Sequence, residues 1–76
     1  MTRSAEPARI DTRGLKCPWP VLRAARAMRA HDAVLLLADD PVARIDVPAL
    51  AAERHWSILV EHRADHDAYH LRKGCD

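Results

Sequence analysis

The chain has 76 residues, of which 12 are basic and 11 acidic, and its formal net charge is +1. A near-neutral chain of this length has no overall attraction for nucleic acid or membrane and cannot enclose a large substrate cavity. We therefore expect a single domain over residues 1–76, with flexible tails at residues 1–7 and 74–76. The sequence shows no apolar run of membrane-spanning length and no signal-peptide pattern, so we expect a cytoplasmic protein.

The first half of the chain alternates between strand and helix patterns. Residues 8–12 predict a short strand, which Gly14 ends. Residues 18–29 carry apolar side chains at helical spacing and arginines on another face, which predicts an amphipathic helix. The aliphatic run at residues 33–38 is too short for a helix and is typical of a buried strand, which the following Asp-Asp-Pro sequence ends.

The second half predicts one helix and a β-hairpin. Asp46 is the N-cap candidate of the helix, Pro48 lies in its first turn, and the helix is expected to end near His55. Residues 57–63 and 68–73 alternate with a period of two and predict two strands joined by a polar turn.

The predicted order is βαβαββ, and this order defines the fold class. Right-handed crossover connections place both helices on the same face of the sheet. We therefore expect an α+β protein, a two-layer α/β sandwich whose four-stranded mixed sheet has two helices packed on one face. The opposite face stays open to solvent or to a partner.

Two prolines mark the start of the first helix, directly after Cys17. Proline is tolerated there because the first N–H groups of a helix have no partner within it. If Pro18 is the first helical residue, Cys17 is the N-cap. If the helix begins at Pro20 with Trp19 as its cap, Cys17 lies further out in a loop. Both positions leave the thiol near the surface.

The surroundings of Cys17 predict a reactive thiol, which makes it the candidate catalytic residue. The positive end of the helix dipole and the cations Arg13 and Lys16 favour the thiolate. The amide of Trp19 is the main backbone donor able to reach the sulfur. A free cysteine is often a buried hydrophobe, but polar residues precede Cys17 and prolines follow it, which argues against burial.

Several side chains near the thiol have both a functional and a structural interpretation. Lys16 and the arginines of the helix either dock an acidic partner or form a solvated face. Trp19 either anchors a partner or covers the helix start. Asp40 and its acidic neighbours either contact a partner or serve local turns and caps, the role that the pattern favours. The candidate docking residues are Arg13, Lys16, Trp19, Arg23, Arg26 and Asp40.

Three histidines close to the hairpin, with two aspartates between them, suggest a metal site; they are His62, His66 and His70. With a turn at residues 64–67, Glu61 lies opposite His70. His62 then lies opposite Tyr69, so the histidines are divided between the two faces of the sheet. We therefore expect no metal site and no cofactor.

Three motifs together resemble a known family. Gly-Leu-Lys-Cys-Pro-Trp-Pro opens the first helix at residues 14–20, Asp-Asp-Pro follows the second strand at residues 39–41, and Asp-Val-Pro opens the second helix at residues 46–48. Over residues 10–73 the chain strongly resembles the TusA/SirA-like sulfur carrier family. The resemblance implies a two-layer α/β sandwich that carries sulfur as a persulfide on Cys17. The residues that support the motif are Gly14, Leu15, Pro18 and Pro20.

The resemblance also implies protein partners. The donor is a cysteine desulfurase or a rhodanese-type enzyme. The acceptor belongs to a sulfur-transfer pathway such as tRNA thiolation, molybdenum cofactor assembly, sulfur oxidation or selenium metabolism. Direct nucleic-acid binding is not expected, because acidic side chains match the basic ones and few aromatic rings are present for base stacking.

Two other functions remain open on the residues alone. One is a regulatory module that contacts protein or RNA through the open sheet face or the basic helix, without sulfur transfer. The other is a thiol redox protein that uses Cys17 and Cys75, which needs their Cα atoms within roughly 7 Å. Cys75 is either a resolving thiol or an exposed tail cysteine, and its terminal position favours the latter. Persulfide loading on Cys17 separates the carrier from the regulatory module, and a reversible intramolecular disulfide identifies the redox protein.

Overall fold

The computed structural model describes residues 7–74, and its elements follow the predicted βαβαββ order. They are β1 (Ala8–Asp11), α1 (Trp19–Ala30), β2 (Ala33–Ala38), α2 (Ala43–Arg54), β3 (Trp56–His62) and β4 (Asp67–Lys73). Strand β2 has its predicted bounds, and the other strands differ from prediction by one residue at one or both ends. Most of the two expected tails, residues 1–6 and 75–76 with Cys75, lies outside the described residues.

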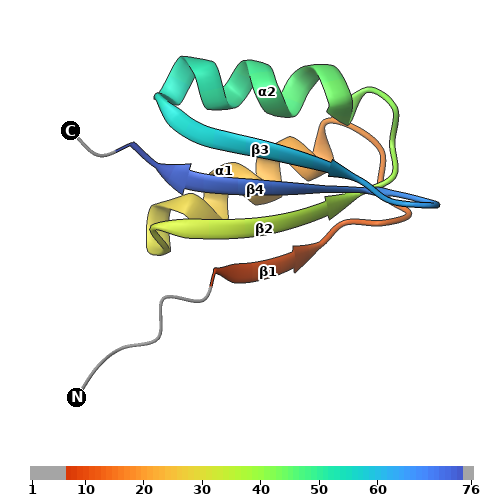
Figure 1. Ribbon diagram of the computed structural model, residues 1–76, viewed down its shortest axis with the longest axis horizontal. Helices are drawn as coiled ribbons and strands as arrows, with labels where there is room; N and C mark the ends of the chain where they lie inside the picture. The colour runs from red at the N-terminus through yellow and green to blue at the C-terminus, as the bar shows by residue number, and fades with distance from the viewer. Residues whose placement is uncertain (1–6, 75–76) are drawn as a thin grey trace.

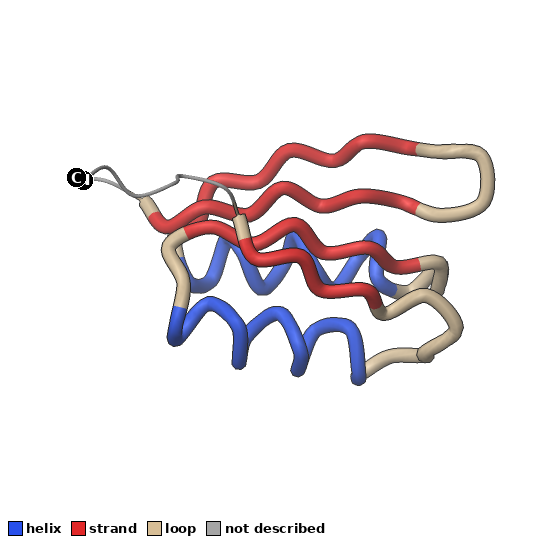
Figure 2. Tube along the Cα trace, turned by 90° about the horizontal axis from the view of Figure 1, so that it is seen from below, coloured by secondary structure: helices blue, strands red, loops and turns tan. Residues whose placement is uncertain are grey.

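The four strands form one mixed sheet in the order β1-β2-β4-β3. Strand β1 runs parallel to β2, whereas β4 is antiparallel to both β2 and β3. Figure 1 shows α1 behind this sheet and α2 alongside β3, and the edge-on view in Figure 2 shows both helices as a second layer on one face. The predicted two-layer α+β fold is confirmed. Neither α1 nor α2, the two helices within residues 7–74, has the length and apolar character that crossing a bilayer requires.

The core lies between the helices and the face of the sheet that they cover. Alternate residues of the two central strands point toward the helices, as the period of a strand requires. The helices present mainly small side chains to them, which allows the two layers to approach closely. The buried residues of this core include Val34, Leu36, Tyr69 and Leu71 from the sheet and Ala24, Met28, Val47 and Ala51 from the helices.

Helix α2 begins at Ala43, earlier than predicted, so the assignment of Asp46 as its N-cap is wrong. The amide of Asp46 already donates a 2.9 Å hydrogen bond to the carbonyl of Val42. The helix starts early because Asp40 organises the turn before it. The Asp40 carboxylate accepts from the Val42 amide at 3.2 Å, and its carbonyl accepts from the Ala43 amide at 3.0 Å. Pro48 consequently lies inside the helix rather than in its first turn.

The hairpin turn also begins one residue earlier than predicted. His62 pairs with Asp67 rather than Tyr69, and His70 pairs with Leu59 rather than Glu61, so both predicted pairs are wrong. In this register the side chain of Asp67 faces the helices, where it is buried. His62 and His70 still lie on opposite faces of the sheet. Within residues 7–74, no group of three histidine, cysteine or acidic side chains is placed to hold a metal ion.

Asp67 is the buried carboxylate that sets this register. Its side chain is only 4% exposed, and it accepts a hydrogen bond from Arg44 Nε at 2.7 Å. On its other side His62 Nδ1 lies 2.8 Å away, and the Tyr69 hydroxyl donates to it at 3.4 Å. Burial raises the pKa of Asp67, but the hydrogen bonds from Arg44 and His62 outweigh burial, and the net shift is downward. The carboxylate therefore joins α2, β3 and β4 at one end of the sheet.

We expect Asp67→Asn to lower the free energy of unfolding by about 1–3 kcal/mol, because a buried charge-assisted hydrogen bond to Arg44 is lost. Since folding lowers the pKa of Asp67, its contribution is fully present above about pH 4 and is lost as the pH falls through the folded pKa. Urea unfolding at several pH values measures the difference. Asp65→Asn is the control, because Asp65 is exposed, and its unfolding should match the parent's. Equal stability of the two variants at pH 7 would contradict this role of Asp67.

Candidate functional site

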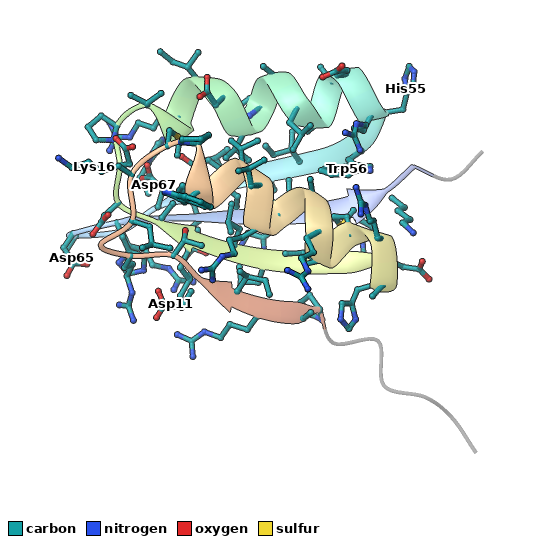
Figure 3. The ribbon with its side chains drawn as sticks, turned by 180° about the vertical axis from the view of Figure 1, so that it is seen from behind. Asp11, Lys16, His55, Trp56, Asp65 and Asp67 are labelled. Carbon is teal, nitrogen blue, oxygen red and sulfur yellow. The ribbon has the colours of Figure 1, made fainter. Side chains whose placement is uncertain are left out.

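Cys17 lies in the loop between β1 and α1, at the end of the sheet where both helices begin. Its side chain is half-buried and packs against the core beneath it. Figure 3 shows the neighbouring Lys16 at the same end of the molecule as Asp65 of the hairpin and the buried Asp67. The half-buried thiol thus lies at one end of the molecule.

The start of α1 differs from both predicted registers. The helix begins at Trp19, with Pro18 as its N-cap and Pro20 buried in its first turn. Cys17 therefore precedes the N-cap instead of occupying it. The Trp19 amide donates to the carbonyl of Lys16 at 2.9 Å, so its predicted role as a donor to the sulfur is wrong. The Cys17–Pro18 peptide bond is cis.

Residues 12–18 connect β1 to α1 and carry Cys17, and we call them the thiol loop. Hydrogen bonds to the end of β2, and to the two residues that follow it, hold this loop in place. The buried Thr12 donates to the carbonyl of Leu37 through both its amide, at 2.8 Å, and its hydroxyl, at 2.6 Å. The Gly14 amide donates to the Asp39 carboxylate at 3.1 Å. The Cys17 amide donates to Asp40 Oδ2 at 2.6 Å. The two aspartates assigned to a turn therefore also anchor the thiol loop.

The residues that support the motif differ in what they do here. Gly14 has a φ of +89°, a conformation that side chains of L-residues rarely adopt. Leu15 is half-buried below the loop, and its amide closes a turn on the Thr12 carbonyl at 3.0 Å. Pro18 is exposed, whereas Pro20 is fully buried.

The charges around Cys17 oppose the predicted thiolate. Burial, followed by the negative charges of Asp40 and Asp46, raises the pKa of Cys17 to about 11. Arg13 does not offset this effect, because its guanidinium pairs with Asp11 at 2.7 Å. The pKa of the Asp40 carboxyl is lowered, chiefly by the hydrogen bond from the Cys17 amide and then by that from Val42, with a smaller contribution from the charge of Lys16. These surroundings therefore favour the thiol, opposite to the expectation from the helix dipole and the nearby cations.

Exposed apolar side chains flank the thiol loop. Trp19 is 54% exposed at the start of α1, and Leu22 follows it one turn later, half exposed. Val42 and Ile45 are exposed at the start of α2, Ile45 to 72%. The sequence did not single out these last two residues, because their position depends on the unpredicted early start of α2.

Two of the basic candidates, Arg23 and Arg26, lie along α1 rather than at the thiol. Arg23 and Arg26 are both exposed and line a shallow hollow together with Ile10 and His31. Lys16 is exposed beside Cys17 and contributes a positive charge near Asp40. Of the six candidate docking residues, Lys16, Trp19 and Asp40 therefore surround the thiol loop most closely.

The fold and this loop define a class of small two-layer α+β proteins that present a thiol just before a helix. Residues 8–73 match the family described as sulfurtransferase TusA. The chain therefore belongs to the TusA sulfurtransferase family, and the resemblance carried by its motifs is confirmed.

One relative agrees with this assignment, and one solved structure shares the fold. A protein from Archaeoglobus fulgidus, whose name provisionally describes it as a sulfur carrier, is 46% identical over 44 residues. The matched region covers 54% of this chain and 57% of that protein, so the chain spans little more than half of this relative. The crystal structure of a SirA-like protein from Desulfitobacterium hafniense has a TM-score of 0.81 at 22% identity, over 88% of this chain and 97% of that one. The structural likeness shows the fold, while the family and the first relative support a role as a sulfur carrier.

We expect Gly14→Ala to lower the free energy of unfolding by about 1 kcal/mol, because an L-residue is strained at the positive φ of Gly14. The added Cβ meets no atom within 4 Å, so the loss comes from the backbone alone. Gly14→Asn is the matched variant and should lose less, since asparagine tolerates the left-handed region better. Chemical denaturation measures both. An alanine variant as stable as the parent would show that the loop does not need the positive φ.

Proposed function

We propose that this protein carries sulfur as a persulfide on Cys17, which it receives from a cysteine desulfurase or a rhodanese-type donor. It then passes the sulfur to a protein acceptor in a pathway such as tRNA thiolation. The placement of Cys17 carries the proposal: among residues 7–74 it is the one cysteine, and its loop is anchored at the end of the molecule where both helices begin. Membership of the sulfurtransferase family supports it.

The transfer step balances without an external oxidant. The Cys17 sulfur attacks the outer sulfur of the donor's cysteine persulfide, so an S–S bond forms on Cys17 while the donor's S–S bond breaks. The donor cysteine leaves as a thiolate and takes up the proton that the Cys17 thiol loses. The same exchange, with Cys17 now as the leaving group, passes the outer sulfur to an acceptor thiol.

This chemistry needs contact between proteins rather than a substrate pocket. The exposed Trp19 and Ile45 provide apolar surface on both sides of the thiol loop, which suits docking of a partner around the thiol. The redox alternative depends on Cys75, which lies outside the described residues. The proposed carrier needs Cys17 alone.

We expect Cys17→Ser to abolish sulfur loading and to leave the fold intact, because the loop is held by the backbone amide of residue 17, which serine retains, and serine is smaller than cysteine. Each protein is incubated with a cysteine desulfurase and cysteine, and mass spectrometry then detects the added sulfur. Cys75→Ser is the matched control and should load like the parent. Sulfur addition to the Cys17→Ser variant equal to the parent's would overturn the assignment.

A further inference from the structure

Asp40 is the acidic group most directly tied to Cys17. Its Oδ2 accepts a hydrogen bond of 2.6 Å from the Cys17 amide. Only the Cα and Cβ atoms separate this nitrogen from Sγ, so the carboxylate that binds the amide lies beside the sulfur. The other oxygen, Oδ1, accepts from the Val42 amide at 3.2 Å, which fixes the carboxylate between the two loops.

A second carboxylate faces the same sulfur from α2. Asp46 is half-buried in the first turn of this helix, and its negative charge helps to raise the pKa of the Cys17 thiol. From β4, the buried Tyr69 also faces Cys17, and burial, followed by the charge of Asp67, raises the pKa of its hydroxyl to about 12, so the hydroxyl stays neutral and adds no charge beside the thiol. Lys16, the residue before Cys17, is exposed, and its positive charge acts on Asp40.

We propose that Asp40 is a positioning residue for sulfur transfer: it fixes the Cys17 backbone and, together with Asp46, presents negative charge beside the sulfur, which a cationic side chain of the donor faces in the docked complex. The donor thus supplies a positive charge that the charges around Cys17 in the free protein do not provide. This role presupposes that Cys17 is the sulfur-carrying residue proposed above.

The proposal follows the proton through the transfer step. Negative charge develops on the Cys17 sulfur as its proton leaves for the donor's departing thiolate, and two adjacent carboxylates oppose that charge. A lysine or arginine of the donor that pairs with Asp40 and Asp46 removes this opposition only in the docked complex. The thiol is then activated where a persulfide is present and stays inactive elsewhere.

The first test measures the titration of Cys17 in a Cys75→Ser background, which leaves Cys17 as the sole thiol of the chain. The rate of alkylation by iodoacetamide is followed against pH, since only the thiolate reacts. We expect Asp40→Asn and Asp46→Asn each to lower the apparent pKa of Cys17 by about one unit. Below the pKa, a shift of one unit raises the alkylation rate about tenfold.

Asp39→Asn is the matched control, because Asp39 binds the amide of Gly14, three residues before Cys17, rather than the amide of Cys17 itself. All three variants remove one negative charge, and asparagine keeps an oxygen that can accept the amide hydrogen bond. A pKa shift in the Asp40 and Asp46 variants but not in the Asp39 variant supports the proposal. Equal shifts in all three, or none in any, would overturn it. If Asp40→Asn does not fold, Asp46→Asn decides by the same comparison.

The second test measures the charge preference of Cys17 with two small disulfides. Cystamine carries two positive charges and dithiodiglycolate two negative ones, and each forms a mixed disulfide with Cys17 while releasing one thiol. We expect the Cys75→Ser protein to react roughly tenfold faster with cystamine, and the Asp40 and Asp46 variants to lose most of this preference. A faster reaction with dithiodiglycolate, or a preference that the variants leave unchanged, would contradict the proposal. Neither test uses a sulfur donor, so failure of persulfide loading is a separate result.

Discussion

The hydrogen bond from the Cys17 amide to the Asp40 carboxylate, 2.6 Å long, joins the two loops on which the functional end of the molecule depends. The same carboxylate accepts from Val42 and so helps to begin α2, while the next residue after Cys17 is the N-cap of α1. A single side chain therefore sets both the position of the thiol and the start of the second helix. Because the acceptor is ionised, this is among the stronger hydrogen bonds that a partly buried loop can form.

The same interaction places the thiol in an unfavourable electrostatic position for ionisation. Sequence motifs that put cysteine before a helix suggest a low pKa, because the helix dipole favours the thiolate. Here Cys17 precedes the N-cap, and the dipole effect falls off beyond the first turn, whereas Asp40 is in direct contact with the residue. Burial and two carboxylates therefore decide the outcome and raise the pKa of Cys17.

The strands, and the order of strands and helices along the chain, could be predicted from the sequence because the patterns that mark them are local. The aliphatic run of β2 has the same bounds in prediction and structure, since a continuous apolar segment of that length has few other uses. The helix starts were misplaced because proline fits several early positions: Pro20 occupies the second helical position of α1, and Pro48 lies inside α2. The hairpin register was wrong because it depends on Arg44, whose contact with Asp67 spans 23 positions of sequence. No local pattern reports such a contact.

Prediction of the candidate site divides in the same way. Cys17 could be identified from the sequence because the residues that mark it adjoin it. The charges beside Cys17 could not be predicted, because Asp40 and Asp46 come close to it only when α2 and the turn before it have folded. Arg13 illustrates the same limit, since its pairing with Asp11 removes a cation that sequence proximity alone assigned to the sulfur.

The distribution of charge near the thiol also constrains how a partner can bind. The net charge of the chain is only +1, so long-range attraction gives a partner little guidance, and local arrangement decides. Acidic groups lie at the thiol, whereas Arg23 and Arg26 lie further along α1, with the apolar Trp19 before them. A donor with a cation facing Asp40 and acidic groups facing Arg23 and Arg26 has opposite charges at both regions when it binds in one orientation. The reversed orientation sets like charges against each other in both regions, and like-charge contacts are an effective means of excluding wrong encounters.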